Sequence, residues 1–136
     1  MQSILLTGGS GYLGRRVAKR LTDAGHQTWT LTRGPADQLA GQGEQWNPRQ
    51  PQSLQIWSHH PRTVIHMAGI AHCHRHEPSR REYFRSNVIL TRRLAQTAKE
   101  QGVKHFILIS SVAVYGPGCT AASEQQPRCP AGDRRR

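Results

Sequence analysis

The sequence predicts an α/β protein with a doubly wound parallel sheet of about five strands. Short apolar runs alternate with amphipathic helical patterns along the chain, which is typical of consecutive βαβ units. The first run, residues 4–7, leads directly into Gly8, Gly11 and Gly14, and a helical pattern follows. A glycine-rich turn between a strand and a helix is the context in which a Rossmann-like sheet binds the pyrophosphate of a dinucleotide. Gly8 would permit the tight turn, Gly11 the approach of a pyrophosphate, and Gly14 close helix packing.

Four further elements are expected between residues 12 and 59. Residues 12–24 form a helix, because apolar side chains recur every four residues and a glycine follows. Residues 27–32 alternate and form a second strand, a short third strand lies near residues 44–46, and residues 54–59 form a short helix. The apolar face of the first helix and the glycine that ends it are Leu13, Val17, Leu21 and Gly25.

The second half of the chain predicts a strand, a long helix and another strand. Residues 63–67 form a buried strand, and residues 79–101 form the longest helix, which Gly102 ends. Residues 104–110 form an apolar strand that is buried on both faces, as parallel strands usually are. The face that the long helix turns inward is expected to carry Tyr83, Asn87, Leu90, Leu94 and Thr97.

Composition narrows the class of protein. The 136 residues carry a net charge of +11, but the basic residues are scattered and few aromatic residues accompany them, which argues against nucleic-acid binding. No apolar run is long enough to span a membrane, and the N-terminus does not resemble a signal peptide. Cys73, Cys119 and Cys129 lack the spacing of metal ligands and favour a cytoplasmic location.

Four segments, in this order, resemble the extended short-chain dehydrogenase/reductases, and among these the nucleotide-sugar epimerase/dehydratase group. The segments are TGGSGYLG at 7–14, HMAG at 66–69, NV at 87–88 and SSVAVYG at 110–116. The resemblance extends to the region of Pro130 and implies an incomplete dinucleotide-binding domain over residues 1–118. Residues 119–136 are expected to be an irregular tail rich in proline and arginine.

The resemblance also implies a cofactor site and one catalytic residue. Ser111 stands where the family places the hydroxyl that hydrogen-bonds the reacting group of the substrate. Tyr115 belongs to the same motif but is not the family's catalytic tyrosine. The residues expected at the cofactor are Gly8, Gly11, Tyr12, Leu13, Gly14, Thr32, Arg33, Met67, Ala68, Gly69 and Asn87.

Three residues of the quoted segments, His66, Asn87 and Ser111, also have a simpler structural explanation. A histidine at a strand end, such as His66, is more often hydrogen-bonded in the core than functional. The amide of Asn87 could join the helix to a loop, and Ser111 could cap the chain after its strand. The sequence leaves these alternatives open.

The end of the second strand bears on the choice between NAD and NADP. Members of the family that prefer NAD carry an acidic residue there, which binds the ribose 2′-hydroxyl, whereas this chain has Thr32 followed by Arg33. A guanidinium pairs with a 2′-phosphate in bidentate fashion. The sequence therefore favours NADP slightly over NAD. Near the third strand, Asn47 is the nearest polar candidate to face the adenine.

The family's acid/base pair, Tyr-x-x-x-Lys, does not occur in these 136 residues. We therefore expect the NAD(P)-binding part of an oxidoreductase that acts on a sugar nucleotide in the intact relative. It would lack the C-terminal part and the substrate domain and have little or no turnover. A fragment, a premature stop and a frameshift are all open as explanations.

A non-catalytic NAD(P)-binding or sensing module, or half of a complementing pair, is the alternative. An uncovered sheet edge at residues 106–109 would allow self-association.

A run of histidines follows the HMAG segment. His72, His74 and His76 alternate with Cys73 and Arg75, which matches no structural zinc pattern. We expect no physiological metal site here, and contact with a substrate phosphate is the better explanation of the run.

Overall fold

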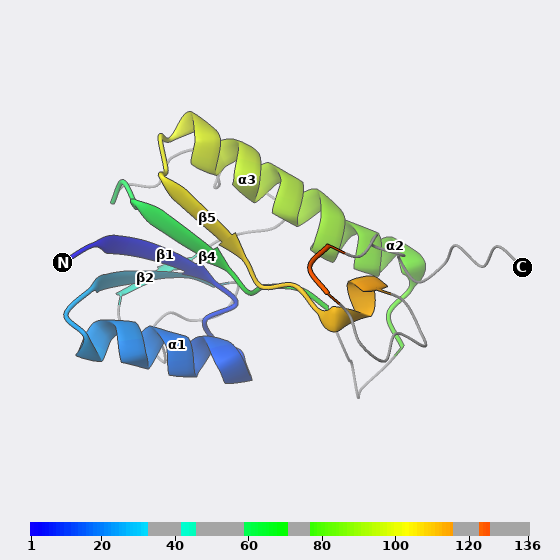
Figure 1. The fold of residues 1–136 in the computed structure, drawn as a ribbon, viewed down its shortest axis with the longest axis horizontal. Coiled ribbons are helices and arrows are strands. Elements are labelled where there is room, and N and C mark those ends of the chain that lie inside the picture. Colours follow the sequence, from blue (N-terminus) through cyan, green and yellow to red (C-terminus); the bar gives the residue numbers. More distant parts are fainter. Residues whose placement is uncertain (33–41, 46–58, 71–76, 116–122, 126–136) are drawn as a thin grey trace, which may run out of the picture.

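The computed structural model describes residues 1–32, 42–45, 59–70, 77–115 and 123–125. Five parallel strands form one sheet in the order β3-β2-β1-β4-β5 (Figure 1), which confirms the predicted fold class. The strands are β1 (Ser3–Thr7), β2 (Gln27–Thr32), β3 (Gln42–Gln45), β4 (Thr63–His66) and β5 (His105–Leu108). The chain runs outward from β1 to β3 and then outward on the other side from β4 to β5. The direction therefore reverses between β1 and β4, where sheets of this kind bind their ligands.

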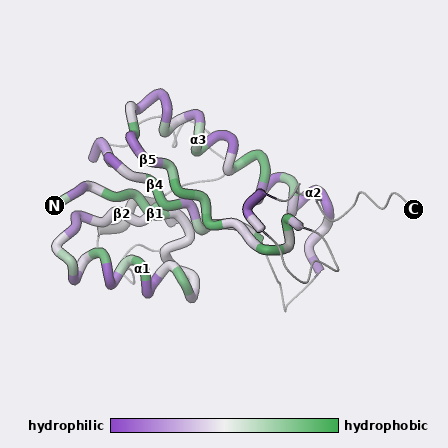
Figure 2. Tube along the Cα trace, viewed as in Figure 1, coloured by the Kyte–Doolittle hydropathy of each residue, from purple (hydrophilic) through white to green (hydrophobic). Residues whose placement is uncertain are grey.

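Helices cover both faces of the sheet. Helix α1 (Tyr12–Asp23) lies on one side, and helix α3 (Leu90–Glu100) lies on the other (Figure 1). Apolar residues concentrate along the strands, whereas polar residues are frequent on both helices (Figure 2). This distribution is expected of two amphipathic helices that bury one stripe each.

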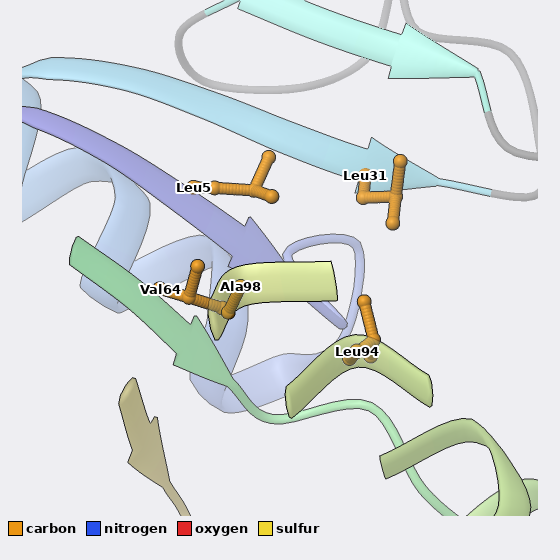
Figure 3. Packing of buried hydrophobic residues seen from close by; sticks show 5 residues of the cluster. All are labelled: Leu5, Leu31, Val64, Leu94 and Ala98. Carbon is orange, nitrogen blue, oxygen red and sulfur yellow. The ribbon is translucent and has the colours of Figure 1, made fainter. Parts of the chain in front are cut away.

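The core has two parts because successive side chains of β1 point to opposite faces of the sheet. Ile4 and Leu6 pack against Ala18 of α1. The other face carries a cluster with residues from three strands and α3 (Figure 3). This second cluster consists of Leu5, Leu31, Val64, Leu94 and Ala98.

Helix α1 packs on a narrower face than its sequence predicted. Gly14 and Ala18 are buried, and Val17 and Leu21 are half-buried. Leu13, however, is 48% exposed, so its assignment to the apolar face is wrong. The reason is geometric: Leu13 lies about 100° around the helix from Gly14, and the small Gly14–Ala18 side is the one that approaches the sheet.

The long predicted helix is present as three continuous pieces. These are α2 (Arg80–Tyr83), a π-helical segment η2 (Phe84–Ile89) and α3. Leu94 and Thr97 are buried, as expected. Asn87 is exposed, so its expected place on a buried face is wrong. It lies in η2, and its side chain hydrogen-bonds Ile70 in the loop after β4 rather than packing on the sheet.

Strand β5 is not buried on both faces, contrary to prediction. Ile107, Leu108 and Ile109 are each 45–50% exposed, although their apolar sequence is that of an interior strand. Among the described strands, β5 pairs with β4 alone, so it forms the edge of this sheet. After it, a short 3-10 helix η3 (Val112–Tyr115) begins with Val112 strongly exposed. Local hydrophobicity predicted the strand correctly, but neighbours decide its burial.

Several expectations fall on residues outside the described part of the chain. These are most of the short helix at 54–59, Asn47, the run of residues 72–76 and the domain boundary at 118. Within the described residues, no helix is long and apolar enough to cross a bilayer.

The difference between β1 and β5 predicts a large difference in the effect of one substitution. Leu6→Ala empties a site with 0% exposure and should lower the free energy of unfolding by about 2–5 kcal/mol. Leu108→Ala, at 50% exposure, should cost less than about 1 kcal/mol. Urea denaturation of both variants measures the two values. Equal losses would contradict the exposed position of β5.

Candidate functional site

The turn from β1 to α1 is built by backbone contacts that exclude side chains. Gly8 has a φ of +74°, and a Cβ there would lie 2.7 Å from the backbone nitrogen of Ala68. A Cβ on Gly14 would lie 2.1 Å from the carbonyl oxygen of Gly8. Gly8 therefore lets the turn meet the chain after β4, and Gly14 lets the first turn of α1 press on the turn that precedes it.

The N-terminal end of α1 carries no capping side chain. Gly11 is its N-cap, makes no side-chain cap and lies in extended backbone. The first turn contains no acidic residue. Since the first N–H groups of a helix have no partner within the helix and carry its positive dipole end, this end suits an anion.

Gly9 is a structural requirement that the glycine spacing did not reveal. A Cβ on Gly9 would lie 2.5 Å from Cγ2 of Thr30, which is fully buried on β2. The turn thus rests on the neighbouring strand. Only the pairing of β1 with β2 brings Gly9 and Thr30 together, so no local signal in the sequence could have identified this contact.

A cleft of about 510 Å³ opens between the glycine turn, the ends of β2 and β4, and the long helix. Six predicted cofactor residues line it: Gly8, Gly11, Thr32, Met67, Ala68 and Gly69. The other lining residues are Thr7, Ser10, Leu31, Ile70, Glu82, Arg85, Ser86, Ile89, Leu90, Arg93 and Leu94. The cleft lies at the carboxyl ends of β1 and β4, where the sheet order reverses.

The sequence analysis did not predict the residues of the long helix that line this cleft. Arg85, Ile89 and Arg93 recur every four residues and all line the cleft, so they lie on one stripe of the helix. The periodicity was visible in the sequence, but the expected inward face was placed on the residues that contact the core. The long helix has a second functional face, and only its position beside the glycine turn reveals it.

Some predicted residues lie outside the cleft lining. Tyr12 and Leu13 are exposed on the first turn of α1, and the guanidinium of Arg16 lies 3.7 Å from the centre of the Tyr12 ring. Gly14 supports the turn from behind. Ser111 is exposed just before η3, and its carbonyl accepts a hydrogen bond from the Val114 nitrogen. Arg33 is outside the described residues.

Asn87 joins the helix to the loop that follows β4. Its side-chain oxygen accepts a hydrogen bond from the Ile70 nitrogen at 2.7 Å, and its side-chain nitrogen donates to the Ile70 carbonyl at 2.7 Å. This is the helix–loop contact that the sequence left as an alternative. Asn87 thereby holds the loop of Met67, Ala68 and Gly69, although it does not itself line the cleft.

His66 connects the glycine turn to the helix through a chain of hydrogen bonds. Thr91 Oγ1 donates to the Asn87 carbonyl, so it accepts from His66 Nε2 at 2.8 Å. His66 Nδ1 therefore carries a lone pair and accepts from Thr7 Oγ1. Thr7 Oγ1 in turn accepts from the Ala68 nitrogen at 3.3 Å. The network assigns the Nε2–H tautomer and supports the expectation of a core histidine.

Burial of His66 lowers the pKa of its imidazole, because desolvation disfavours the charged form. Protonation would also place a proton on Nδ1, which now accepts a hydrogen bond from the Thr7 hydroxyl. Among the described residues, no group of three or more His, Cys, Asp or Glu side chains could hold a metal ion.

Comparison with known proteins agrees with this geometry. The model of the NAD dependent epimerase/dehydratase family matches residues 4–134. The chain belongs to this family. A UDP-glucose 4-epimerase of Klebsiella pneumoniae is 30% identical over 128 residues, which are 83% of this chain and 91% of that protein. A UDP-glucose 4-epimerase of Mus musculus is 27% identical, with 85% of this chain and 39% of the mouse protein covered.

A solved structure in the same superfamily shares the fold. It is a short-chain dehydrogenase/reductase superfamily protein from Agrobacterium tumefaciens with bound NAD. It is 28% identical to this chain, superimposes with a TM-score of 0.79, and covers 94% of this chain and 39% of its own. This chain therefore spans about two fifths of the length of the mouse and Agrobacterium proteins.

The packing at Gly14 predicts that two glycine substitutions will differ in their effects on stability. Gly14→Ala places a methyl group against rigid backbone and should lower the free energy of unfolding by at least about 2 kcal/mol. Gly11→Ala meets only the Gly8 carbonyl at 3.2 Å and should cost about 1 kcal/mol or less. Chemical denaturation compares them. A milder effect at Gly14 than at Gly11 would contradict the close approach.

The lowered pKa of His66 predicts a loss of stability on acidification. The unfolded chain takes up a proton near the ordinary pKa of 6.5, whereas the folded chain resists it. The stabilisation is therefore complete above pH 6.5 and is lost as the pH falls from 6.5 toward the lower folded pKa. Unfolding free energies measured from pH 8 downward, for the wild type and His66→Gln, test this. His60→Gln, at an exposed site, is the control. A pH dependence unchanged in His66→Gln would exclude His66 as its source.

Proposed function

We propose that this chain is the NAD(P)-binding part of an oxidoreductase that acts on a nucleotide sugar. The observation that carries the proposal is the cleft in which the glycine turn, the open end of α1 and the Met67–Gly69 loop meet. The close backbone contacts at Gly8 and Gly14 exclude side chains at these two positions of the turn, where a pyrophosphate would bind. The curated relatives are called UDP-glucose 4-epimerases, which supports the substrate class.

Different described residues are assigned to different parts of the cofactor. Gly8, Ser10 and Gly11 would bind the pyrophosphate at the helix N-terminus. Thr32 would lie beside the adenosine ribose, and Met67, Ala68 and Gly69 would line the other wall. The bound nicotinamide would supply hydride acceptance and return. Tyr12 and Leu13, exposed on the same helix turn, are proposed to reach the cofactor through their backbone.

Catalysis by these 136 residues alone is expected to be absent or very slow. Ser111 is proposed to contact the reacting group of the substrate, but the chain contains no Tyr-x-x-x-Lys pair to act as acid and base. Turnover of UDP-glucose or UDP-galactose with added nucleotide can be followed by chromatography of the products. Measurable conversion by the purified chain would contradict this expectation.

A non-catalytic binding module, or half of a complementing pair, is the second candidate. The observation in its favour is the exposed apolar edge strand β5, with Ile107, Leu108 and Ile109 open to solvent. An edge of this kind can pair with another copy or another chain. We also propose a cytoplasmic location, because the sequence has three cysteines, an odd number, without the spacing of metal ligands.

A thermal melt with saturating NADP or NAD tests the proposed function directly. Ligand at a hundred times its Kd should raise Tm by about 8–16 °C for a domain of this size. The larger shift identifies the preferred cofactor, which we expect to be NADP because Thr32 supplies no carboxylate at the end of β2. A broad transition that neither nucleotide changes would contradict the proposal.

A further inference from the structure

The helix wall of the cleft carries charges that the turn and loop do not explain. Three charged side chains line it: Glu82, Arg85 and Arg93. The Glu82 carboxylate is occupied, since it accepts hydrogen bonds from the Ser79 nitrogen at 2.8 Å and the Ser79 hydroxyl at 2.7 Å. Neither guanidinium group has a hydrogen bond or ion pair with another described residue. The wall therefore offers two guanidinium groups to an anion.

Packing places Arg93 at one end of this wall. Its neighbour Leu94 is buried in the same cluster as Leu31 of β2. Leu31, Thr32 and Arg93 line the same cleft. Arg85 is eight residues earlier, in the π-helical segment η2 that precedes α3. Arg93 therefore lies at the β2 end of the cleft, whereas Arg85 lies toward the other end.

The end of β2 is where this architecture places the adenosine ribose. Thr32 is buried and uncharged there, so it can neither repel nor neutralise a phosphate. Arg93 lines the same cleft from the helix wall, next to Leu94, which is fully buried in the core. A planar guanidinium matches phosphate oxygens in bidentate fashion.

We propose that Arg93 binds the 2′-phosphate of NADP and makes this chain prefer NADP over NAD. The proposal rests on the proposed function and adds a specificity residue to it. It differs from the expectation at Arg33, because the charge comes from the helix after β4 rather than from the turn after β2. Arg93 would select the cofactor by contact with a group that only NADP carries.

Two adjacent arginines provide a matched test. Arg92 and Arg93 are both exposed, but only Arg93 lines the cleft. Isothermal titration of the 136-residue chain with NADP, NAD and adenosine 2′,5′-bisphosphate should show that Arg93→Gln weakens NADP and the bisphosphate about 10- to 100-fold. NAD affinity should change less than about threefold, and Arg92→Gln should leave all three ligands unchanged. Arg93→Lys, which keeps the charge but loses the planar fork, should fall between wild type and Arg93→Gln.

Each contrary result has a distinct meaning. Equal weakening of NAD and NADP would overturn the proposal and assign Arg93 to the pyrophosphate. Unchanged NADP affinity in Arg93→Gln, with a large loss in Arg33→Gln, would overturn it in favour of Arg33. Failure of the wild-type chain to bind either nucleotide would overturn the proposed function itself. Melts without ligand confirm that each variant is folded, and Arg93→Lys repeats the test should Arg93→Gln unfold.

Discussion

The close approach of the β1–α1 turn to the first turn of α1 is the contact on which the rest of the site depends. The position of a Cβ on Gly14 is only 2.1 Å from the Gly8 carbonyl oxygen, so backbone occupies the space that any side chain would need. This contact sets where α1 starts and points its N-terminal end at the cleft. Gly8 extends the same constraint across the sheet, because its own Cβ position is blocked by the backbone after β4.

A second constraint joins this turn to the long helix. His66 is fully buried and hydrogen-bonded on both ring nitrogens, to Thr7 beside the turn and to Thr91 on α3. Asn87 then holds Ile70 at the far end of the loop. The loop of Met67 to Gly69 is thus fixed from both ends. The neutral imidazole is the form that fits, since one nitrogen donates and the other accepts.

The two sides of the sheet differ in how well their apolar side chains are buried. The side at β1, β2 and β4 has a closed core and a cleft with a defined shape. At β5, apolar side chains with the sequence of an interior strand face solvent. In the described residues, the binding half of the fold is therefore better enclosed than the side on which Ser111 lies.

The sequence alone determined the fold class, the glycine turn and most strand positions, because these depend on local features. Alternation of apolar residues, glycine at an intolerant position and a helix after a turn act over a few residues. The motifs in the sequence also predicted Met67, Ala68 and Gly69 as residues of the site. Their physical effects are short-range, so they can be read along the chain.

Tertiary structure alone decided burial, supporting contacts and the second wall of the cleft. Leu13 and β5 are exposed because their neighbours in space, rather than their hydrophobicity, set burial. Gly9 is required by Thr30, and His66 by Thr7 and Thr91, through pairs separated by 20 or more residues. Arg93 was assigned to the site only because its neighbour Leu94 packs in the same core cluster as Leu31 of β2 and Arg93 itself lines the cleft. Such contacts depend on how strands pair and helices pack, which no local pattern specifies.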